Sequence, residues 1–314
     1  MIAPTSAPPD SPASLILGTR GSGLALAQAD LAAAALIKAF PAAEISIRKI
    51  TTSGDQKLDL SLIKQTPAGA KGLFTKELEE ALLSGEIDIA VHSCKDMPGE
   101  MLPGLTLASV LERAPSEDVL LSRTAPGLDA LPSGARIGTS SVRRARQLLW
   151  KRPDLGVEEI RGNVHTRLRK LMTSDTLEGT ILARAGLERL GFRMDEGRIE
   201  FEGNTFYTEI LDLLPAIGQG AIALQTRAEG RASEAARAVN HLPTWLAIRA
   251  ERELMRLLQG DCNLPVGVAT TRSGDSLRME VVLFGPEQEP PRQVSVEGPA
   301  NEPEALAAAA FNAL

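Results

Sequence analysis

The sequence predicts an α/β fold, with two similar α/β domains on mostly parallel sheets and a small C-terminal α+β domain. Three observations support this prediction. The chain has 314 residues, more than one ordinary domain holds. Strand-like and helix-like segments alternate in two successive series, which is typical of βαβ units. Beyond residue 231 the order changes to helices, short strands and a last helix.

The first series forms the N-terminal domain. Short apolar runs bounded by turn residues predict strands, and longer alanine-rich or amphipathic runs predict helices. We expect strands at 15–18, 45–50 and 87–91 and helices at 23–39 and 73–83. The polar stretch 51–72 is too long for a simple connection and is a candidate mobile lid. Residues 1–14, rich in Pro, Ala and Ser, are expected to form a disordered leader.

The second series and the C-terminal segment follow the same rules. We expect strands at 119–121, 136–138, 157–160 and 180–183, and helices at 141–151, 164–172 and around 187. The apolar, glycine-rich segment 214–225 can return the chain to the first sheet. After two helices, we expect strands at 266–271, 277–284 and 293–296 and a helix at 304–314. The domains predicted are 15–113 with 216–232, then 118–212, then 236–314.

Composition excludes several classes of protein. No stretch reaches the ~20 uncharged apolar residues that span a bilayer, and the leader lacks the charged and apolar regions of a secretory signal. We therefore expect a cytoplasmic protein without a membrane partner. Two cysteines cannot form a disulfide framework, and three widely separated histidines argue against a metal site.

The distribution of charge points to a small anionic ligand. The net charge of −6 argues against nucleic acid as a partner. Residues 136–193 nevertheless contain 13 Lys and Arg against 6 Asp and Glu. Aromatic residues make up only 3% of the chain, so no platform for stacking bases is expected. A basic segment without aromatics indicates phosphates or carboxylates on a small molecule.

Three strand-to-helix turns have the composition of anion sites, at 18–23, 138–144 and 161–167. Each places a small hydroxyl or amide residue at a helix start, where unpaired backbone N–H groups and the helix dipole favour an anion. Each also has arginines within one turn. The alternative is that Thr139, Ser140 and Asn163 are ordinary N-caps and the arginines a solvated face. Three such turns at carboxyl ends of strands, where open α/β sheets bind ligands, favour the anion site.

The segment 90–98 is the best candidate for catalysis. It follows a buried strand and contains Ser93, Lys95 and Asp96, a group well placed for proton handling, with Asp96 the candidate carboxylate. The alternative is that Asp96 is only a cap. Cys94 is expected to be a buried, apolar-like residue. Cys262 differs, because it lies on a helix-to-strand loop among small polar residues, where a thiol is more reachable.

These segments together resemble the porphobilinogen deaminase (hydroxymethylbilane synthase) family. The resemblance runs from about residue 15 to 267 in unbroken order and includes KGLFTKEL at 71–78, LPAIGQGA at 214–221 and AER at 250–252. It implies two α/β domains facing each other across a cleft, as in periplasmic binding proteins. It also implies a monomeric transferase of haem and tetrapyrrole biosynthesis. Such an enzyme condenses four porphobilinogen molecules head to tail, with loss of ammonia, to give hydroxymethylbilane.

The resemblance also implies roles for individual residues. Cys262 carries a covalent dipyrromethane cofactor through a thioether, and Asp96 is the catalytic carboxylate. The residues implied to bind the cofactor are Ser93, Lys95, Thr139, Ser140, Ser141, Arg143, Arg144, Gly162 and Arg167. Those implied to bind the incoming pyrrole are Arg20, Ser22, Arg161, Asn163, Arg189 and Gln219. Lys71 and Phe74 belong to the lid.

The chain departs from the usual family pattern without touching Asp96 or Cys262. The departures are Gly23 for Pro, Cys94 for Met, His165 for Gly, Gln225 for Glu, Asp261 for Gly, and Ala70 before the lid lysine. The main rival function is a non-catalytic anion- or solute-binding protein with a two-domain cleft. An exported receptor would need a signal, which is not seen, and has no use for the Cys262 loop. A phosphate-binding enzyme is disfavoured, because neither a P-loop nor a complete GxGxxG is present.

Overall fold

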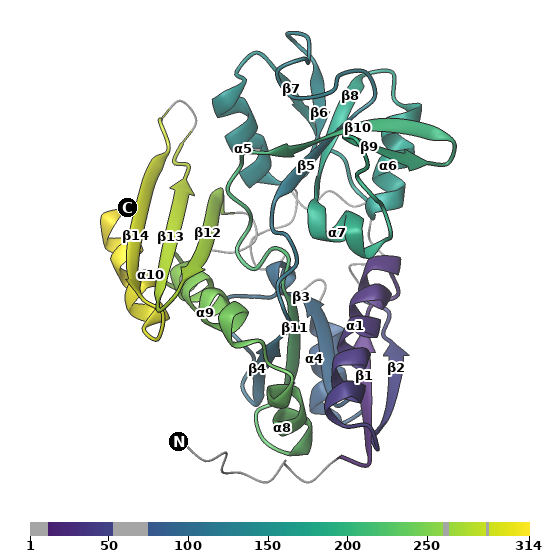
Figure 1. Ribbon diagram of the computed structural model, residues 1–314, viewed down its shortest axis with the longest axis vertical. Helices are drawn as coiled ribbons and strands as arrows, with labels where there is room; N and C mark the ends of the chain where they lie inside the picture. Colours follow the sequence, from purple (N-terminus) through teal and green to yellow (C-terminus); the bar gives the residue numbers. More distant parts are fainter. Residues whose placement is uncertain (1–11, 53–74, 260–263, 287–288) are drawn as a thin grey trace.

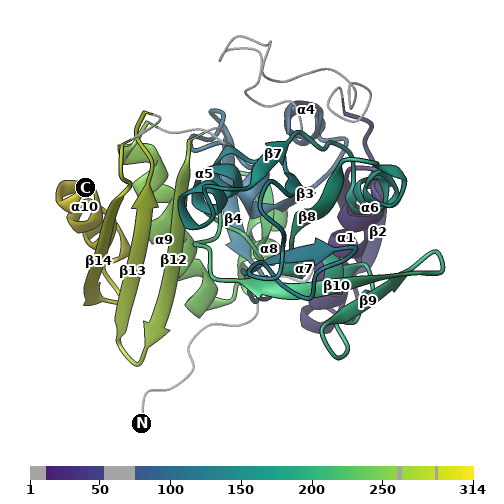
Figure 2. The ribbon, with the colours of Figure 1, turned by 90° about the horizontal axis from the view of Figure 1, so that it is seen from above.

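The computed structural model describes residues 12–52, 75–259, 264–286 and 289–314. These residues form three sheets with helices packed against them (Figure 1). Two α/β units lie one above the other, and the third sheet lies beside them (Figures 1 and 2). The predicted α/β class with a separate C-terminal α+β unit is confirmed. None of the described helices has the length and apolarity of a membrane span. The expected lid and leader lie almost entirely outside the described residues.

The first sheet has the strand order β2-β1-β3-β11-β4. Its strands are β1 Ser14–Thr19, β2 Glu44–Lys49, β3 Ile89–Ser93, β4 Leu105–Val110 and β11 Ile222–Arg227, and its helices are α1 Gly23–Ala39, α4 Lys76–Leu83 and α8 Arg231–Ala238. β1 pairs in parallel with β2 and β3, as expected of βαβ units. Ala29, Ala32 and Ala33 of α1 are buried against Leu15 and Leu17. Their small side chains allow this helix to lie close to the sheet.

The second sheet has six strands in the order β7-β6-β8-β5-β10-β9. Its strands are β5 Asp118–Ser122, β6 Arg136–Gly138, β7 Gly156–Glu158, β8 Leu177–Ala183, β9 Arg198–Phe201 and β10 Asn204–Leu211, and its helices are α5 Val142–Lys151, α6 Val164–Thr173 and α7 Arg184–Arg189. β6 runs parallel to β7 and β8. The strands β4, β9 and β10 were not predicted, although the alternation of apolar and polar residues in β4 and β9 is a signal that could have indicated them.

The expectation of mostly parallel sheets is wrong, since both sheets are mixed. β11 is antiparallel to β3 and β4, while β5 is antiparallel to β8 and β10. The reason lies in the two segments that connect the sheets. The chain leaves the first sheet after β4 and enters the second as β5, then leaves it after β10 and returns as β11. These outgoing and incoming strands are neighbours in each sheet, so they must run in opposite directions. The predicted return of 214–225 to the first sheet is confirmed.

The C-terminal sheet is a three-stranded antiparallel meander. Its strands are β12 Val266–Ser273, β13 Ser276–Leu283 and β14 Arg292–Pro299, and its helices are α9 Leu242–Leu257 and α10 Pro303–Ala313. Leu254, Met279 and Ala307 are buried together between sheet and helices. Figure 2 shows both helices lying beside this sheet.

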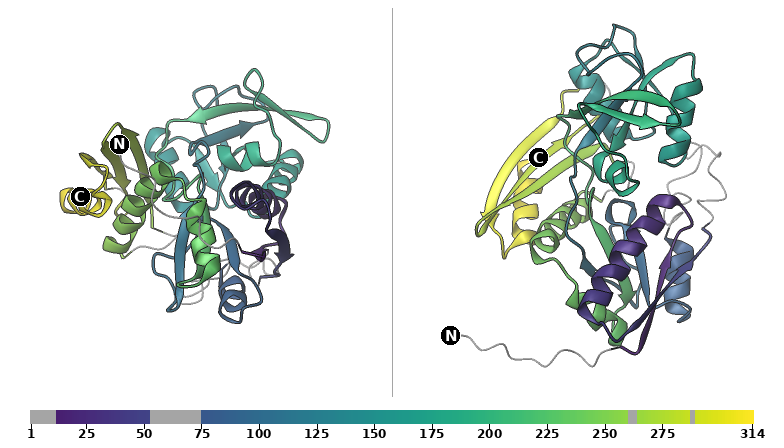
Figure 3. Two further views of the ribbon diagram at one scale, coloured as in Figure 1. Left: turned by 60° about the horizontal axis from the view of Figure 1, so that its bottom comes forward. Right: turned by 45° about the vertical axis from the view of Figure 1, so that its right-hand side comes forward.

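A tightly packed junction holds the three units together where the two connections cross. Arg113, on the outgoing connection, forms a 2.6 Å ion pair with buried Glu251 of α9. Glu251 also accepts a hydrogen bond from Gly218 N, on the returning connection, at 2.8 Å. Gly218 and Gly220 have φ of +72° and +86°, and a Cβ at Gly220 would lie 2.3 Å from a carbonyl oxygen. Only glycine therefore fits these positions. Away from this junction, α1 of the first unit contacts α7 of the second (Figure 3).

Candidate active site

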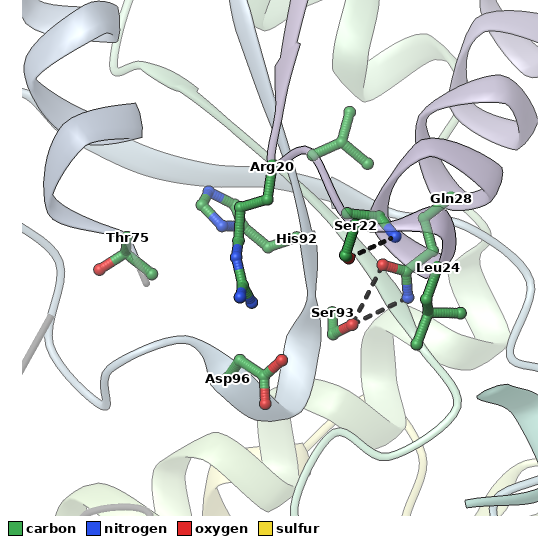
Figure 4. A pocket seen from close by; sticks show the side chains of 10 residues that line it. Arg20, Ser22, Leu24, Gln28, Thr75, His92, Ser93 and Asp96 are labelled. Atoms are coloured by element: carbon green, nitrogen blue, oxygen red, sulfur yellow. Dashed lines mark hydrogen bonds between the residues drawn. The ribbon is translucent and has the colours of Figure 1, made fainter. Parts of the chain in front are cut away.

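The carboxyl ends of β1 and β3 open into a pocket of the first unit. The pocket is lined by Arg20, Ser22, Gln28, His92, Ser93 and Asp96, among others. Arg20 extends toward Asp96, which is exposed and sits at the end of the 3₁₀ turn Cys94–Asp96 (Figure 4). The structure thus brings three predicted residues of the first unit, Arg20, Ser22 and Asp96, into one pocket.

The wall of this pocket is held by hydrogen bonds between neighbouring elements. Ser22 is the N-cap of α1, and its Oγ accepts from Ala25 N at 3.2 Å. The Ser93 hydroxyl oxygen lies 2.9 Å from Gln28 Nε2 and 3.1 Å from Gln28 Oε1, both within hydrogen-bond distance (Figure 4). Gln28 was not predicted. The sequence feature that could have indicated Gln28 is a polar residue in an otherwise alanine-rich helix, at a position that is buried.

His92 lies at the pocket floor and was also missed. Its Nε2 is 2.9 Å from Gln225 Oε1, and Gln225 Nε2 donates to Glu79 Oε1 at 3.0 Å. Because the Gln225 amide nitrogen faces a carboxylate, its oxygen faces the imidazole, so His92 Nε2 is the protonated nitrogen. Burial lowers the pKa of His92 to about 4. The imidazole is therefore neutral at pH 7, and it is a fixed part of the pocket.

On the second unit, the predicted turns start α5 and α6. Ser141 is the N-cap of α5 and Asn163 the N-cap of α6, where Asn163 Oδ1 accepts from Thr166 N at 2.9 Å. Thr139 and Ser140 are not N-caps. Thr139 Oγ1 accepts from Ser141 N at 3.1 Å, and Ser140 Oγ donates to Ile160 O at 2.6 Å. The alternative that these residues are N-caps is right for Asn163. It is wrong for Thr139 and Ser140, because α5 begins at Val142 and its N-cap is Ser141.

Arg143 and Arg144 are buried, each with 5% of its surface exposed. Both bind the same carboxylate, Asp118. Arg144 Nη2 donates to Asp118 Oδ1 at 2.7 Å, and Arg143 Nη2 lies 2.8 Å from Asp118 Oδ2. The two arginines, mainly Arg144, hold the pKa of the Asp118 carboxyl far below its usual range despite burial. The alternative of a solvated face is therefore wrong for these two arginines.

Lys95 joins the basic residues from the opposite unit. Its Nζ lies 3.4 Å from Gln219 Oε1, and Gln219 Nε2 donates to Asp118 Oδ1 at 2.8 Å. Burial and the positive charge of Arg144 lower the pKa of Lys95 to about 8. Lys95 and Asp96 adjoin in the chain, so the carboxylate pocket and the buried arginines belong to one site between the two units.

The remaining predicted arginines have different surroundings. Arg167 Nε donates to Gly162 O at 2.8 Å, and burial and repulsion by Arg144 lower the pKa of Arg167 to about 10. Arg161 forms an ion pair with Glu159. Arg189 Nη2 donates to the Gly220 carbonyl at 2.7 Å, which ties α7 to the returning connection.

Cys94 is 3% exposed, and burial raises the pKa of its thiol to about 11. It is the buried, apolar-like residue that the sequence predicted. Cys262, Lys71 and Phe74 lie outside the described residues.

The basic side of the site is suited to a ligand with several carboxylates. Arg143, Arg144 and Lys95 lie around the single buried carboxylate of Asp118, and Arg167 adds a further positive charge close enough to be repelled by Arg144. Within the described residues, Arg143 Nε is buried and has no hydrogen-bond partner. A buried donor left unpaired costs about 1–3 kcal/mol, so this nitrogen and the surplus of positive charge both favour an anion.

Two family models of the same name together match most of the chain. The family model "porphobilinogen deaminase, dipyromethane cofactor binding domain" matches residues 15–235, and "porphobilinogen deaminase, C-terminal domain" matches 245–314. A porphobilinogen deaminase of Rubrobacter xylanophilus is 46% identical over 276 residues, covering 87% of this chain and 85% of that protein. The Desulforudis audaxviator enzyme of the same name is 43% identical over 293 residues, covering 93% and 91%. Among solved structures, the periplasmic VFT2 domain of Bordetella pertussis BvgS is 15% identical with a TM-score of 0.41, covering 72% and 85%.

Proposed function

The chain belongs to the porphobilinogen deaminase family, and on that premise we propose that porphobilinogen units are joined at the site between its two α/β units, with Asp96 as the catalytic carboxylate. The protein is a transferase, a hydroxymethylbilane synthase of tetrapyrrole biosynthesis with a dipyrromethane cofactor. The observation that carries the proposed site is the meeting of an exposed carboxylate with cations of both units, Lys95 from the first and the buried Arg143 and Arg144 from the second. The rival function, a non-catalytic solute-binding protein, is not favoured.

Asp96 is suited to the chemistry because of where it lies. Loss of ammonia from porphobilinogen leaves a cationic pyrrole, and a carboxylate beside it stabilises that charge and accepts a proton. Opposite charges ~4 Å apart at an effective dielectric constant of ~20 attract by about 4 kcal/mol. That energy corresponds to roughly a thousandfold in rate. Asp96 is exposed within its pocket, so an incoming substrate can reach it.

The proposed attachment point of the dipyrromethane is Cys262. The buried thiol of Cys94, with its raised pKa, is a poor nucleophile. The chain that follows Cys262 begins beside the site, since Val268 N donates to Pro215 O of the returning connection at 2.8 Å. A Cβ at Gly267 would lie 2.9 Å from Gln147 of α5, the helix whose first turn contains Arg143 and Arg144. When bound, the cofactor supplies the free pyrrole carbon to which the first substrate unit is joined.

The other residues are proposed to hold carboxylates. The unpaired Arg143 Nε and the surplus of positive charge support cofactor binding by the lysine and the arginines. The N-termini of α5 and α6 support anion binding by the hydroxyl and amide groups that lie there. The proposed cofactor-binding residues are Ser93, Lys95, Thr139, Ser140, Ser141, Arg143, Arg144, Gly162 and Arg167. The proposed substrate-binding residues are Arg20, Ser22, Arg161, Asn163, Arg189 and Gln219, with Lys71 and Phe74 in the lid.

We also propose the domain division given by the sequence, with one adjustment. Ala235 and Ala236 of α8 are buried in the core of the first sheet, so the first domain extends to about Ala238 and the third begins after it. A monomer in the cytoplasm, without nucleic acid or membrane as partner, completes the proposal.

The mass of the intact protein tests the proposed function. The purified chain should weigh more than its sequence by two pyrrole units and give a coloured adduct with an acidic aldehyde. Cys262→Ala should abolish both signals and turnover of porphobilinogen, whereas the matched variant Cys94→Ala should keep them. An active wild-type protein without added mass would contradict the proposal.

A further inference from the structure

Asp118 is a buried carboxylate that the proposed reaction leaves without a role. It begins β5, between β8 and β10 in the second sheet, and its side chain is fully buried. A carboxylate in such a place requires strong partners, because its removal from water is costly. The three partners of Asp118 come from two separate parts of the chain.

Two of these partners are the arginines at the start of α5. Asp118 Oδ1 accepts from Arg144 Nη2 at 2.7 Å and Nε at 3.1 Å, and Oδ2 lies 2.8 Å from Arg143 Nη2. Each guanidinium has a second anchor on a backbone carbonyl. Arg143 Nη1 donates to Leu214 O at 2.7 Å, and Arg144 Nη1 donates to Ile181 O at 2.8 Å. Two anchors on a planar group fix its orientation.

The third partner connects Asp118 to the opposite unit. Gln219 Nε2 donates to Asp118 Oδ1 at 2.8 Å, and Gln219 Oε1 lies 3.4 Å from Lys95 Nζ. Gln219 belongs to the returning connection between the sheets, and Lys95 belongs to the turn that carries Asp96. Asp118 is therefore linked through one amide to the turn of the catalytic carboxylate.

The positive charges around Asp118 outnumber its single negative charge. Arg143, Arg144 and Lys95 place three positive charges around this one buried carboxylate. Here a surplus of positive charge remains next to the site, with Arg143 Nε still unpaired within the described residues.

We propose that Asp118 is a positioning residue for the cofactor site: it orients Arg143 and Arg144 and, through Gln219, Lys95, so that cations of both units meet the carboxylates of the dipyrromethane. This inference rests on the proposed function. Asp118 itself touches neither cofactor nor substrate. Its removal therefore slows loading of the cofactor.

The test compares loading of the full-length apoprotein in two variants. Asp118→Asn keeps the size of the side chain, removes the charge and presents an amide to two guanidiniums. Incubated with porphobilinogen, this variant should gain the mass of two pyrrole units at least tenfold more slowly than the wild-type protein.

Asp88→Asn is the matched control. Like Asp118, Asp88 binds an arginine, Arg227, at 3.1 Å, and it also accepts from the backbone N–H of Ile16 at 2.9 Å. It precedes β3, whereas the turn with Asp96 follows that strand, so it lies at the opposite end from the site. Asp88→Asn should lower the melting temperature and load at the wild-type rate.

The pH dependence of loading gives a readout that a purely structural role would not change. The groups acting on Lys95 are Asp96 and Asp118, which raise its pKa, and Arg143 and Arg144, which lower it. Lys95 is a cation below its pKa, so loading should decline as the pH rises through about 8. In Asp118→Asn the decline should begin at a lower pH, because one of the two carboxylates that favour the charged lysine is gone.

The outcomes separate this inference from the function on which it rests. A wild-type protein without the added mass overturns the function. A loaded wild type with an Asp118→Asn variant that loads equally fast overturns the positioning role alone. If Asp118→Asn does not fold, Asp118→Glu decides, because it keeps the charge and shifts the carboxylate. A folded Asp118→Glu protein should load several-fold more slowly. Loading at the wild-type rate, or failure of both variants to fold, contradicts the proposal.

Discussion

The two sides of the site differ in whether their charged side chains are exposed or buried. The first unit presents one exposed carboxylate, Asp96, in an open pocket whose floor is the neutral, hydrogen-bonded His92. The second unit buries its arginines around Asp118 and leaves a surplus of positive charge. The comparison indicates a division of labour. A group that acts on each successive substrate must be reachable, whereas groups that hold a permanent ligand are better fixed in advance.

Replacement of Asp96, on the reactive side of the site, should have the largest effect on turnover. Asp96→Asn keeps the shape and removes the charge, so kcat should fall roughly a thousandfold with little change in KM. Asp96→Glu keeps the charge but moves it, and should retain a small fraction of kcat. The measurement is steady-state kinetics, with cofactor content checked by mass. A fully loaded Asp96→Asn enzyme with kcat within tenfold of wild type would remove Asp96 from the mechanism.

Replacement of Arg144 should break the binding side in a different way. Arg144→Leu leaves Asp118 with one arginine, and removing one partner of a buried ion pair typically costs about 3–5 kcal/mol. We expect a lower melting temperature and accumulation of protein without cofactor. Calorimetry and intact mass check this. Arg169→Leu, which breaks an exposed pair with Glu202, is the control and should change neither. Normal loading of Arg144→Leu would contradict the division of labour.

Arg161 and Arg189 should show an intermediate behaviour, because both are only partly buried. Replacement of either by Leu should leave cofactor content unchanged and raise KM for porphobilinogen. A charge-assisted hydrogen bond is worth ~1.5–3 kcal/mol, so the expected rise is about tenfold to a hundredfold. Kinetics at several substrate concentrations test this. If both variants had wild-type KM, these arginines would be structural.

Replacement of His92, in the first unit, should have the smallest effect, and it should change only the pH dependence of stability. Its pKa is about 4 in the folded chain and 6.5 in the unfolded chain, so the unfolded state binds the proton first as pH falls. Stability from the neutral imidazole is complete above pH 6.5 and is lost progressively toward pH 4. The loss should be about 1 kcal/mol per pH unit. Denaturant unfolding at pH 6.5 and 5.5 should show this slope in the wild type and a shallower one in His92→Gln. An unchanged slope would exclude His92 as its source.

Local features of the site followed from the sequence because they depend on neighbours in the chain. Ser22 and Asn163 cap helices within three residues of themselves, and Asp96 follows a buried strand directly. The order of most strands and helices was likewise readable from apolar periodicity. The basic segment 136–193 indicated an anionic ligand, although not which arginines are buried.

Contacts between distant segments were decided only by the tertiary structure. Asp118 is 25 and 26 residues from its arginines and 101 from Gln219, and no periodicity relates such positions. The mixed direction of the sheets has the same origin, since it depends on how the chain crosses twice between two units. The sequence by itself determined which groups are available for binding and catalysis. Packing decided which of them are buried, paired or reachable, because burial and long-range pairing are properties of the folded chain.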